Sequence, residues 1–218
     1  PEPSDAALSP IPDLADLPAP LLRAYYEQPT LALARDLLGK TIWRRTADGI
    51  TAGIIVETEA YISASDPASH NFRRPTRRAA TMFGPPGRAY VYLTYGMHHC
   101  LNVVTEPDGI SAAVLLRAIA PTHGRDLMAV RCPRAAVRDL GRGPGRLCQA
   151  LALTLADNGA DLTGPDLWLS HTSGLIITPD QIATSARIGI SQGIDLPWRF
   201  FLRGHPALSG PSKLNRSP

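Results

Sequence analysis

Two carboxylates and a phenol stand close together in residues 54–61, which read IIVETEAY. Side chains alternate between the two faces of a β-strand, so a strand here would place Glu57, Glu59 and Tyr61 on one face. Ile55 would share that face, while the even-numbered residues would face the core. A carboxylate beside an aromatic ring on a buried strand suits a general base that activates water. A solvated strand edge could hold the same side chains without chemistry, so both interpretations stay open at this point.

A tyrosine-rich stretch, YVYLTYGM at residues 90–97, supplies a second group of candidates. Tyr90 and Tyr92 would share one face of a strand, and Tyr95 would fall at a turn beside Gly96. Tyrosines are common in strands, so Tyr90 or Tyr92 could belong to the core. Tyr95 is badly placed for a core position. An exposed aromatic ring among arginines suits base stacking or insertion between the base pairs of DNA.

The basic residues are grouped along the chain. The 218 residues include 22 Lys and Arg against 19 Asp and Glu, and Lys40 and Lys213 are the only lysines. Residues 67–105 contain no acid but several arginines, and a second group is interrupted by Asp139 alone. The two groups are Arg73, Arg74, Arg77, Arg78 and Arg88, and Arg131, Arg134, Arg138, Arg142 and Arg146. A GC-rich coding sequence would explain the preference for arginine, but the grouping indicates a local contact with nucleic acid.

Three further features carry weaker signals. Arg117 lies in the apolar run 112–119, where it needs Glu57, Glu59 or a phosphate as its partner. Residues 141–146, GRGPGR, lead into a predicted helix and could contact a DNA phosphate. Consecutive strand residues point to opposite faces, so residues 98–100, HHC, cannot readily hold one metal ion by themselves. A zinc site with His70 and a Glu is possible, but the spacing matches no known zinc motif. We therefore predict no metal site and no cofactor.

Composition excludes several classes of protein. The length predicts one domain, and 44% hydrophobic residues with a mean hydropathy of −0.06 exclude wholesale disorder. No run approaches the roughly 18 apolar residues of a membrane span, and the N-terminus shows no secretory pattern. Three cysteines without a C-x-x-C spacing indicate a reducing compartment. We expect a soluble, monomeric, cytoplasmic protein with no membrane partner, associated with the nucleoid if the source is bacterial.

The elements that must position these residues change along the chain from helices to strands and back. We expect short helices within 21–40, broken at Pro29, and strands at 41–45, 51–61, 89–94, 100–105 and 112–119. A helix at 124–140, broken near Pro133, and a helix at 146–156 would follow, and then mixed strands with a short helix near 179–186. This order predicts one α+β domain over residues 21–208 with a mostly antiparallel sheet. Residues 1–20 would form a poorly ordered arm and residues 209–218 a flexible tail.

Taken together, these segments resemble the alkyladenine (3-methyladenine, or methylpurine) DNA glycosylase family. The similarity extends in order from about Leu22 to Pro206. The matching stretches are VETEAY at 56–61 with His70, MF at 82–83, YVYLTYGM at 90–97, Asn102, VLLRA at 114–118, RLCQAL at 146–151, SARIG at 185–189 and RFFLRG at 199–204. No single stretch is sufficient, but their number and order are specific. The resemblance implies a curved sheet with surrounding helices and a protruding β-hairpin that inserts into DNA.

The resemblance also implies a monofunctional base excision repair enzyme. Such an enzyme flips an alkylated or deaminated purine, such as 3-methyladenine, 7-methylguanine or hypoxanthine, out of duplex DNA and hydrolyses its N-glycosidic bond. Glu59 would be the general base that deprotonates water, and Arg117 would help to hold that water and the flipped nucleotide. The pocket for the base would be formed by Tyr61, His70, Tyr92 and Asn102. Asn102 would clash with the amino group of guanine.

The same resemblance assigns a DNA-binding surface and shows where this chain departs from the family. Tyr95 would fill the gap left in the DNA. Further DNA contacts would come from Met97, Thr76, Arg78 and Arg146. Ala79 replaces a usual Asn in a segment that is one residue shorter, His98 and His99 replace an aromatic pair, and Arg146 replaces a common Lys. These departures affect the expected range of substrates and not the expected reaction.

Two other functions remain open from the sequence. A bifunctional glycosylase-lyase could form a Schiff base with the amine of Pro1. That family also carries a four-cysteine zinc finger, which three scattered cysteines cannot form. A DNA-binding module without enzymatic activity would explain the arginine groups and Tyr95, but it would leave Glu59 and Arg117 without a task.

Overall fold

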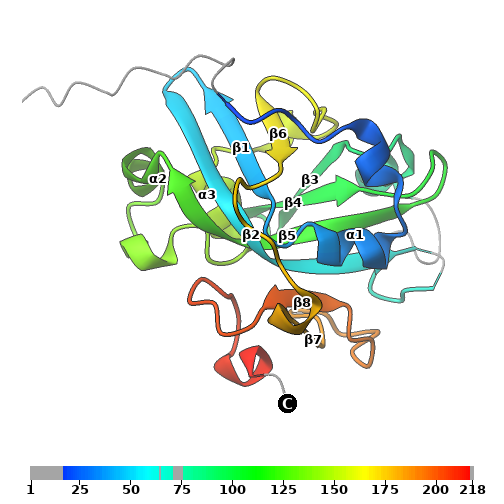
Figure 1. Ribbon diagram of the computed structural model, residues 1–218. Coiled ribbons are helices and arrows are strands. Elements are labelled where there is room, and N and C mark those ends of the chain that lie inside the picture. The colour runs from blue at the N-terminus through cyan, green and yellow to red at the C-terminus, as the bar shows by residue number, and fades with distance from the viewer. Residues whose placement is uncertain (1–16, 64, 71–75, 217–218) are drawn as a thin grey trace, which may run out of the picture.

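The strands form one curled antiparallel sheet, shown in Figure 1. The computed structural model describes residues 17–63, 65–70 and 76–216. Within them the main path of the sheet runs β3-β4-β5-β2-β1-β6, and β8 pairs with both β2 and β7. The strands are β1 (Thr41–Thr46), β2 (Gly49–Ile62), β3 (Ala89–Thr94), β4 (His98–Val104), β5 (Ala112–His123), β6 (Leu167–Ser170), β7 (Ile182–Ser185) and β8 (Arg199–Leu202).

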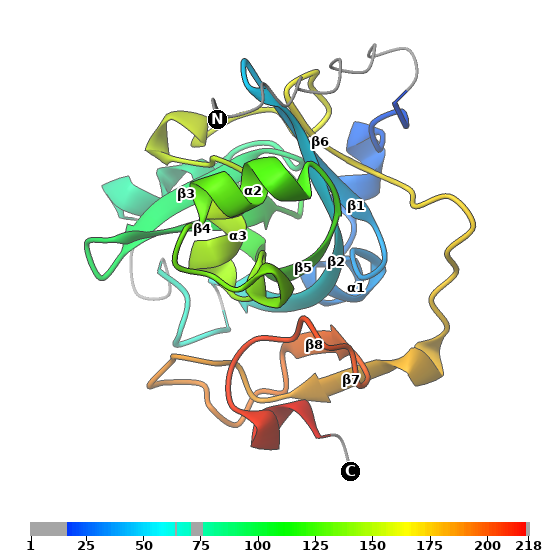
Figure 2. The ribbon, with the colours of Figure 1, turned by 90° about the vertical axis from the view of Figure 1, so that its left-hand side faces the viewer.

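The long strand β2 is the centre of the fold. It pairs with β5 along one edge, and on its other edge it pairs first with β1 and then with β8. The change of partner falls between Ile54, which faces Thr41, and Glu57, which faces Phe201. In Figure 2 the β7–β8 pair and the C-terminal segment lie below the rest of the sheet. The sheet therefore curls into a half-barrel, and one compact α+β domain is confirmed.

The alternation of side chains along β2 is broken at the same place. Ile55 belongs to the main core cluster together with Ala60, whereas Val56 belongs to a separate cluster with Phe201. The prediction that Ile55 shares a face with Glu57 was therefore wrong. The cause is an irregularity of the β2–β5 pairing on both sides of Glu57. Such a bulge places two consecutive residues on the same side of a strand.

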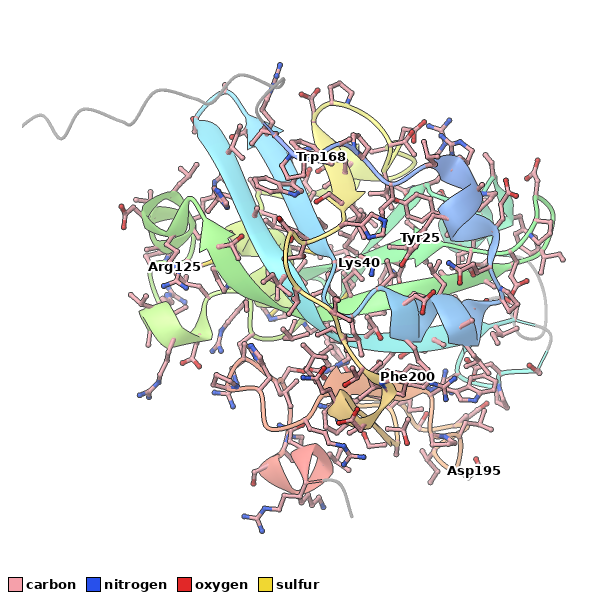
Figure 3. The ribbon with its side chains drawn as sticks, viewed as in Figure 1. Tyr25, Lys40, Arg125, Trp168, Asp195 and Phe200 are labelled. Atoms are coloured by element: carbon pink, nitrogen blue, oxygen red, sulfur yellow. The ribbon has the colours of Figure 1, made fainter. Side chains whose placement is uncertain are left out.

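Helices cover the face of the sheet opposite to the two glutamates. The α-helices in the described residues are α1 (Thr30–Asp36), α2 (Arg125–Arg131) and α3 (Pro144–Ala150). Leu33 and Leu37 near α1 and Leu147 of α3 pack in the main core with Leu101 of β4 and Leu116 of β5. Phe200 of β8 lies below α1 in Figure 3, with the Arg35 guanidinium 4.5 Å from its ring centre. The apolar core lies on this face, so the polar side chains of β2 and β5, including the two glutamates, lie on the opposite face.

The remaining helical segments are short 3-10 turns, and two predicted helices were too long. The turns are η2 (Arg23–Glu27), η3 (Arg77–Phe83), η4 (Val137–Asp139), η5 (Leu155–Asp157), η6 (Pro179–Gln181) and η7 (Ser212–Asn215). The helix expected at 146–156 ends at Ala150, because Ala152 takes a positive φ of 51°. The helix expected near 179–186 is limited to η6, and residues 182–185 form β7 instead. The helices predicted on either side of Pro29 are present, the first as the 3-10 turn η2 and the second as the α-helix α1.

The β3–β4 hairpin projects from the body of the molecule, at the left of Figure 2. Its strands end at Thr94 and begin again at His98. Tyr95 and Gly96 at the turn have φ values of 49° and 70°. Two positive φ angles give a turn whose twist matches the twist of a two-stranded ribbon. Tyr95 is 82% exposed and Met97 is 68% exposed, so the predicted exposure of the turn tyrosine is confirmed.

The ends of the chain can be followed only in part. Most of the expected arm, residues 1–16, lies outside the described residues, and this prediction stays open. Ser209, where the expected tail begins, is buried and hydrogen-bonded to Glu57. Within the described residues, none of the helices combines the length and the hydrophobicity that a membrane-spanning segment requires.

Candidate active site

A cavity of about 590 Å³ opens on the polar face of the sheet. We call it the first cavity. Its walls are residues 67–70, residues 188–192, the hairpin and side chains of the sheet. The sheet side chains that line it include Tyr61 of β2, Tyr92 of β3, Asn102 of β4 and Arg117 of β5. Adjacent antiparallel strands therefore bring together residues that are up to 56 positions apart in the sequence.

Glu59 lies directly behind the wall of the first cavity and has no exposed surface. Its Oε2 accepts hydrogen bonds from the Tyr61 hydroxyl at 2.9 Å and from Arg117 Nη1 at 3.2 Å. Its Oε1 accepts one from the backbone N–H of Ile188 at 2.7 Å. A carboxylate has about four lone-pair positions, and three are used here. The remaining position is on Oε1, beside a residue that lines the cavity.

Glu57 is the second buried carboxylate and does not line the first cavity. Its Oε1 accepts from Arg117 Nε at 2.9 Å, from Arg199 Nε at 2.7 Å and from the Ser209 hydroxyl at 2.9 Å. Its Oε2 accepts from the Ser209 backbone N–H at 2.6 Å. Burial raises the pKa of Glu57, but the charges of Arg117 and Arg199 outweigh burial and hold that pKa below its ordinary value.

Arg117 binds both carboxylates. Of the partners that the sequence left open, the structure therefore shows Glu57 and Glu59. Nε and Nη1 bind Glu57 and Glu59, and Nη2 donates to the Ser209 hydroxyl at 3.1 Å. Burial lowers the pKa of Arg117, but Glu59 and Glu57 more than compensate and raise it, so the guanidinium stays charged. Burial and the charge of Glu59 raise the pKa of Tyr61 well above its ordinary value, so its hydroxyl remains a donor.

Aromatic side chains form the wall across from Arg117. His70 Nδ1 and the Tyr90 hydroxyl share a hydrogen bond of 3.0 Å. The His70 ring meets the Tyr92 ring edge to face, with 4.7 Å between the ring centres. Asn102 Nδ2 donates to the Tyr90 carbonyl at 3.0 Å, which leaves its carbonyl oxygen for a ligand. Tyr90 belongs to a small core cluster. It therefore supports His70 and Asn102, which the sequence predicted as pocket residues.

Arg187 stands behind Tyr61 and was not predicted as a site residue. Its guanidinium lies 4.6 Å from the centre of the Tyr61 ring. It binds Asp66 with two nitrogens and the Ala60 carbonyl at 2.9 Å. This buried ion pair ties the loop that carries His70 to the segment that carries Ile188. The motif SARIG drew attention to this segment, but a backbone N–H directed at Glu59 has no signal in a sequence.

The predicted DNA contacts do not all lie at one place. Tyr95 lines the first cavity, whereas Met97 and Arg146 line a second cavity on the other side of the hairpin. Thr76 accepts a hydrogen bond from the Ala79 N–H at 3.3 Å and caps η3. The side chain of Arg78 lies outside the described part of the structure. Among the described residues, no group of three His, Cys, Asp or Glu has the arrangement of a metal site.

Comparison with known proteins shows the family to which the chain belongs. The methylpurine-DNA glycosylase family matches residues 24–206. Relatives from Frankia casuarinae, Alkaliphilus oremlandii and Chlorobaculum tepidum are 48%, 42% and 46% identical. The matches cover 86%, 87% and 85% of this chain and 91%, 98% and 88% of the relatives, each of which is named "Putative 3-methyladenine DNA glycosylase". The chain belongs to the methylpurine-DNA glycosylase family, and membership implies a DNA glycosylase whose substrate is DNA.

Proposed function

We propose that the protein excises alkylated or deaminated purines from duplex DNA, as a monomer in the cytoplasm, and leaves an abasic site. The observation that carries this proposal is the buried Glu59–Arg117 pair directly behind an aromatic cavity. A flipped purine would lie between the Tyr61 ring and the His70–Tyr92 side of the first cavity. Damaged bases cost least to unstack, which favours them over normal bases during flipping.

The reaction follows from the partners of Glu59. A water that donates to the free position of Glu59 Oε1 loses its proton to this carboxylate as its oxygen attacks C1′. The bond between C1′ and the purine nitrogen breaks, and its electron pair leaves with the base. An alkylated purine such as 3-methyladenine is already cationic and leaves as a neutral molecule, so its release needs no acid. Hypoxanthine is neutral and takes a proton from solvent as it leaves. Arg117 stays charged and holds the carboxylate in place.

The carbonyl oxygen of Asn102 supports a preference among purines. Because its amide nitrogen donates to the Tyr90 carbonyl, the oxygen is the atom that a base at this wall would meet. An amide oxygen accepts hydrogen bonds, so this wall would bind a purine that presents an N–H group to it. We propose that Asn102 selects among damaged purines by the N–H groups that they present at this place.

The direct test measures which bases the protein releases. Duplexes that contain 3-methyladenine, 7-methylguanine, hypoxanthine or ethenoadenine are incubated with excess protein, and free bases are separated and quantified. Release of at least one damaged purine, with undamaged DNA left intact, supports the proposal. Binding to these duplexes without release would instead favour a DNA-binding module.

A second measurement separates hydrolysis from lyase chemistry. A lyase forms a Schiff base between an amine and C1′, and borohydride reduces it to a stable protein–DNA bond. We expect no such bond on abasic DNA, because neither Lys40 nor Lys213 lines the first cavity. Pro1 lies outside the described residues, so a trapped product that disappears when Pro1 is removed would show the bifunctional alternative.

A further inference from the structure

A buried ion pair of Asp66 and Arg187 lies behind the Tyr61 side of the first cavity, and neither side chain of the pair has any exposed surface. Arg187 Nη2 donates to Asp66 Oδ1 at 2.7 Å, and Arg187 Nη1 donates to Asp66 Oδ2. Neither residue lines the first cavity. The pair therefore makes no contact with a ligand in this cavity and can act on the ligand only through its charges or through the residues that it holds.

The Arg187 guanidinium covers one face of the Tyr61 ring. It lies 4.6 Å from the centre of this ring and 5.3 Å from the centre of the Trp198 ring. Tyr61 lines the first cavity, whereas Trp198 does not. A base that stacks on Tyr61 from the cavity would therefore use the opposite face of the ring and would have a guanidinium directly behind that ring.

Arg187 is charged at this place. Burial lowers the pKa of its guanidinium, but the hydrogen bonds and the charge of Asp66 outweigh burial and raise that pKa. A cation attracts the face of an aromatic ring, but two cations on opposite faces of one ring repel each other. Without a matching negative charge, Arg187 would therefore oppose the stacking of a cationic base on Tyr61. Asp66 supplies that negative charge.

The other charged group beside the first cavity is balanced in the same way. Among the described residues that line the cavity there is one arginine, Arg117, and no Asp or Glu. Two guanidiniums, Arg117 and Arg199, are matched there by two carboxylates, Glu57 and Glu59. Both buried groups thus have a net charge of zero. A pocket with balanced walls accepts a cationic base without a net repulsion.

We propose that Asp66 is a specificity-determining residue that allows the pocket to accept cationic purines. This inference rests on the proposed function, because it concerns a flipped base that stacks on Tyr61. The Asp66 carboxylate offsets the charge of Arg187 behind the ring, so a cationic base such as 3-methyladenine is not repelled. A neutral base such as hypoxanthine stacks on the same ring and does not depend on this compensation.

The size of the effect follows from the distances. A base stacked roughly 3.5 Å in front of the Tyr61 ring would lie about 8 Å from the guanidinium and about 12 Å from the carboxylate behind it. At an effective dielectric constant of about 20, the attraction of a carboxylate for a cation at this distance changes an affinity by about tenfold. Asp66→Asn should therefore weaken the binding of a cationic lesion about tenfold relative to a neutral one.

The test compares the two kinds of lesion in one duplex sequence. Dissociation constants are measured for 3-methyladenine, hypoxanthine and undamaged duplexes in a Glu59→Gln parent protein, so that the lesion stays bonded to its strand. In Asp66→Asn, Oδ1 can still accept from Arg187 Nη2 and from the Ala68 N–H, so part of the loop's support remains. We expect the preference for 3-methyladenine over hypoxanthine to fall about tenfold.

Two further variants separate charge from structure. The double variant Asp66→Asn/Arg187→Gln loses both charges, so its preference should return to that of the parent even if both lesions bind more weakly. Asp157→Asn is the matched control. It also removes a carboxylate that pairs with an arginine, Arg44, but neither partner lines the first cavity. Its preference should equal that of the parent. The folding of all variants is checked by their melting temperature.

The outcomes separate this inference from the proposed function. Equal losses on the two lesions in Asp66→Asn would overturn the inference, because Asp66 would then only hold the loop that carries His70. If Asp66→Asn does not fold, the double variant carries the test, and a preference that differs from that of the parent would overturn the inference. Release of bases is measured in parallel with the wild type. Lesion binding without release would contradict the proposed function, whereas the ratio of the two affinities would still decide the role of Asp66.

Discussion

At the scale of residues, the site depends on how one guanidinium is shared. Arg117 binds Glu59, whose other partners Tyr61 and Ile188 line the first cavity, and Glu57, whose other partners Arg199 and Ser209 do not. A buried charge costs several kcal/mol unless it is paired, so each member of this group needs the others. The two carboxylates thus have different tasks although they are two positions apart in the sequence. Under the proposed function Glu59 is the general base, and Glu57 holds Arg117.

Removing the charge of Glu59 should slow base release strongly and leave the binding of lesion DNA unchanged. In Glu59→Gln the amide still fits the site but cannot take a proton from water. We expect single-turnover base release to fall by about 10²- to 10⁴-fold, the usual loss for a general base, with the affinity for lesion DNA retained. Release close to the wild-type rate would remove Glu59 from this role and leave Glu57 as the candidate.

Removing the charge of Glu57 should instead act through stability, and the effect depends on pH. Breaking a buried ion pair costs about 3–5 kcal/mol, so Glu57→Gln should lower the free energy of unfolding at pH 7. The pKa of Glu57 is lower in the folded state than its ordinary value of 4.5. Its contribution is therefore present above pH 4.5 and disappears as pH falls through the folded pKa.

The measurement for Glu57 is chemical denaturation of the wild type and the variant at several pH values. The difference in unfolding free energy between them should shrink as the pH falls below 4.5. Asp195→Asn is the control, because Asp195 is exposed and has no ion pair in the described structure (Figure 3). A difference that stays constant down to acid pH would show that the loss comes from packing and not from charge.

At the scale of elements, the hairpin was predictable and the bulge was not. Tyr95 and Gly96 are local turn signals between two alternating strands, so the sequence is sufficient to place them. The position of Ile55 depends on the irregular pairing of β2 with β5 on both sides of Glu57. Ile119, the partner of Ile55 in β5, is 64 positions away in the sequence. Alternation alone therefore predicted the wrong face for Ile55 while it placed Glu57, Glu59 and Tyr61 correctly.

The hairpin also allows a prediction about base flipping. Tyr95 is 82% exposed on a turn beside the first cavity, so it can occupy the space that a flipped nucleotide leaves. Returning the base to the stack is favourable by a few kcal/mol. Tyr95→Ala should therefore lose most activity on lesions in stable base pairs and less on mismatched lesions. Its melting temperature should change little, because an exposed side chain buries little area.

The comparison of substrates is the measurement for Tyr95. Single-turnover release is compared between a hypoxanthine in a stable pair and the same base in a mismatch or a single-stranded region. An equal loss on every substrate together with a lower melting temperature would show that Tyr95 supports the fold of the hairpin and not flipping.

At the scale of the whole molecule, the site is assembled from distant parts of the chain. The backbone of Ile188 and the side chain of Ser209 reach Glu59 and Glu57 from the C-terminal third. Neither residue has a chemical signature in the sequence, because a backbone N–H is present at every position except proline and serine is common. Glu59 and Arg117 could be predicted from the sequence because their charged side chains lie in otherwise apolar strands. The residues that hold this group in place, Ile188 and Ser209, could be identified only from the fold.

This assembly predicts that the C-terminal segment controls the position of Arg117. The Ser209 hydroxyl donates to Glu57 and accepts from Arg117 Nη2, whereas Asn215 binds only Arg199 and the Ser209 carbonyl. Ser209→Ala should therefore lower the single-turnover rate by about tenfold, equivalent to roughly 1.4 kcal/mol of activation free energy. Asn215→Ala should lower the melting temperature about as much as Ser209→Ala does, but it should have a smaller effect on the single-turnover rate. Both rates are measured at saturating lesion DNA. If the two variants lose stability and rate in the same proportion, the segment only stabilises the fold, and Arg117 is held in place by the two glutamates alone.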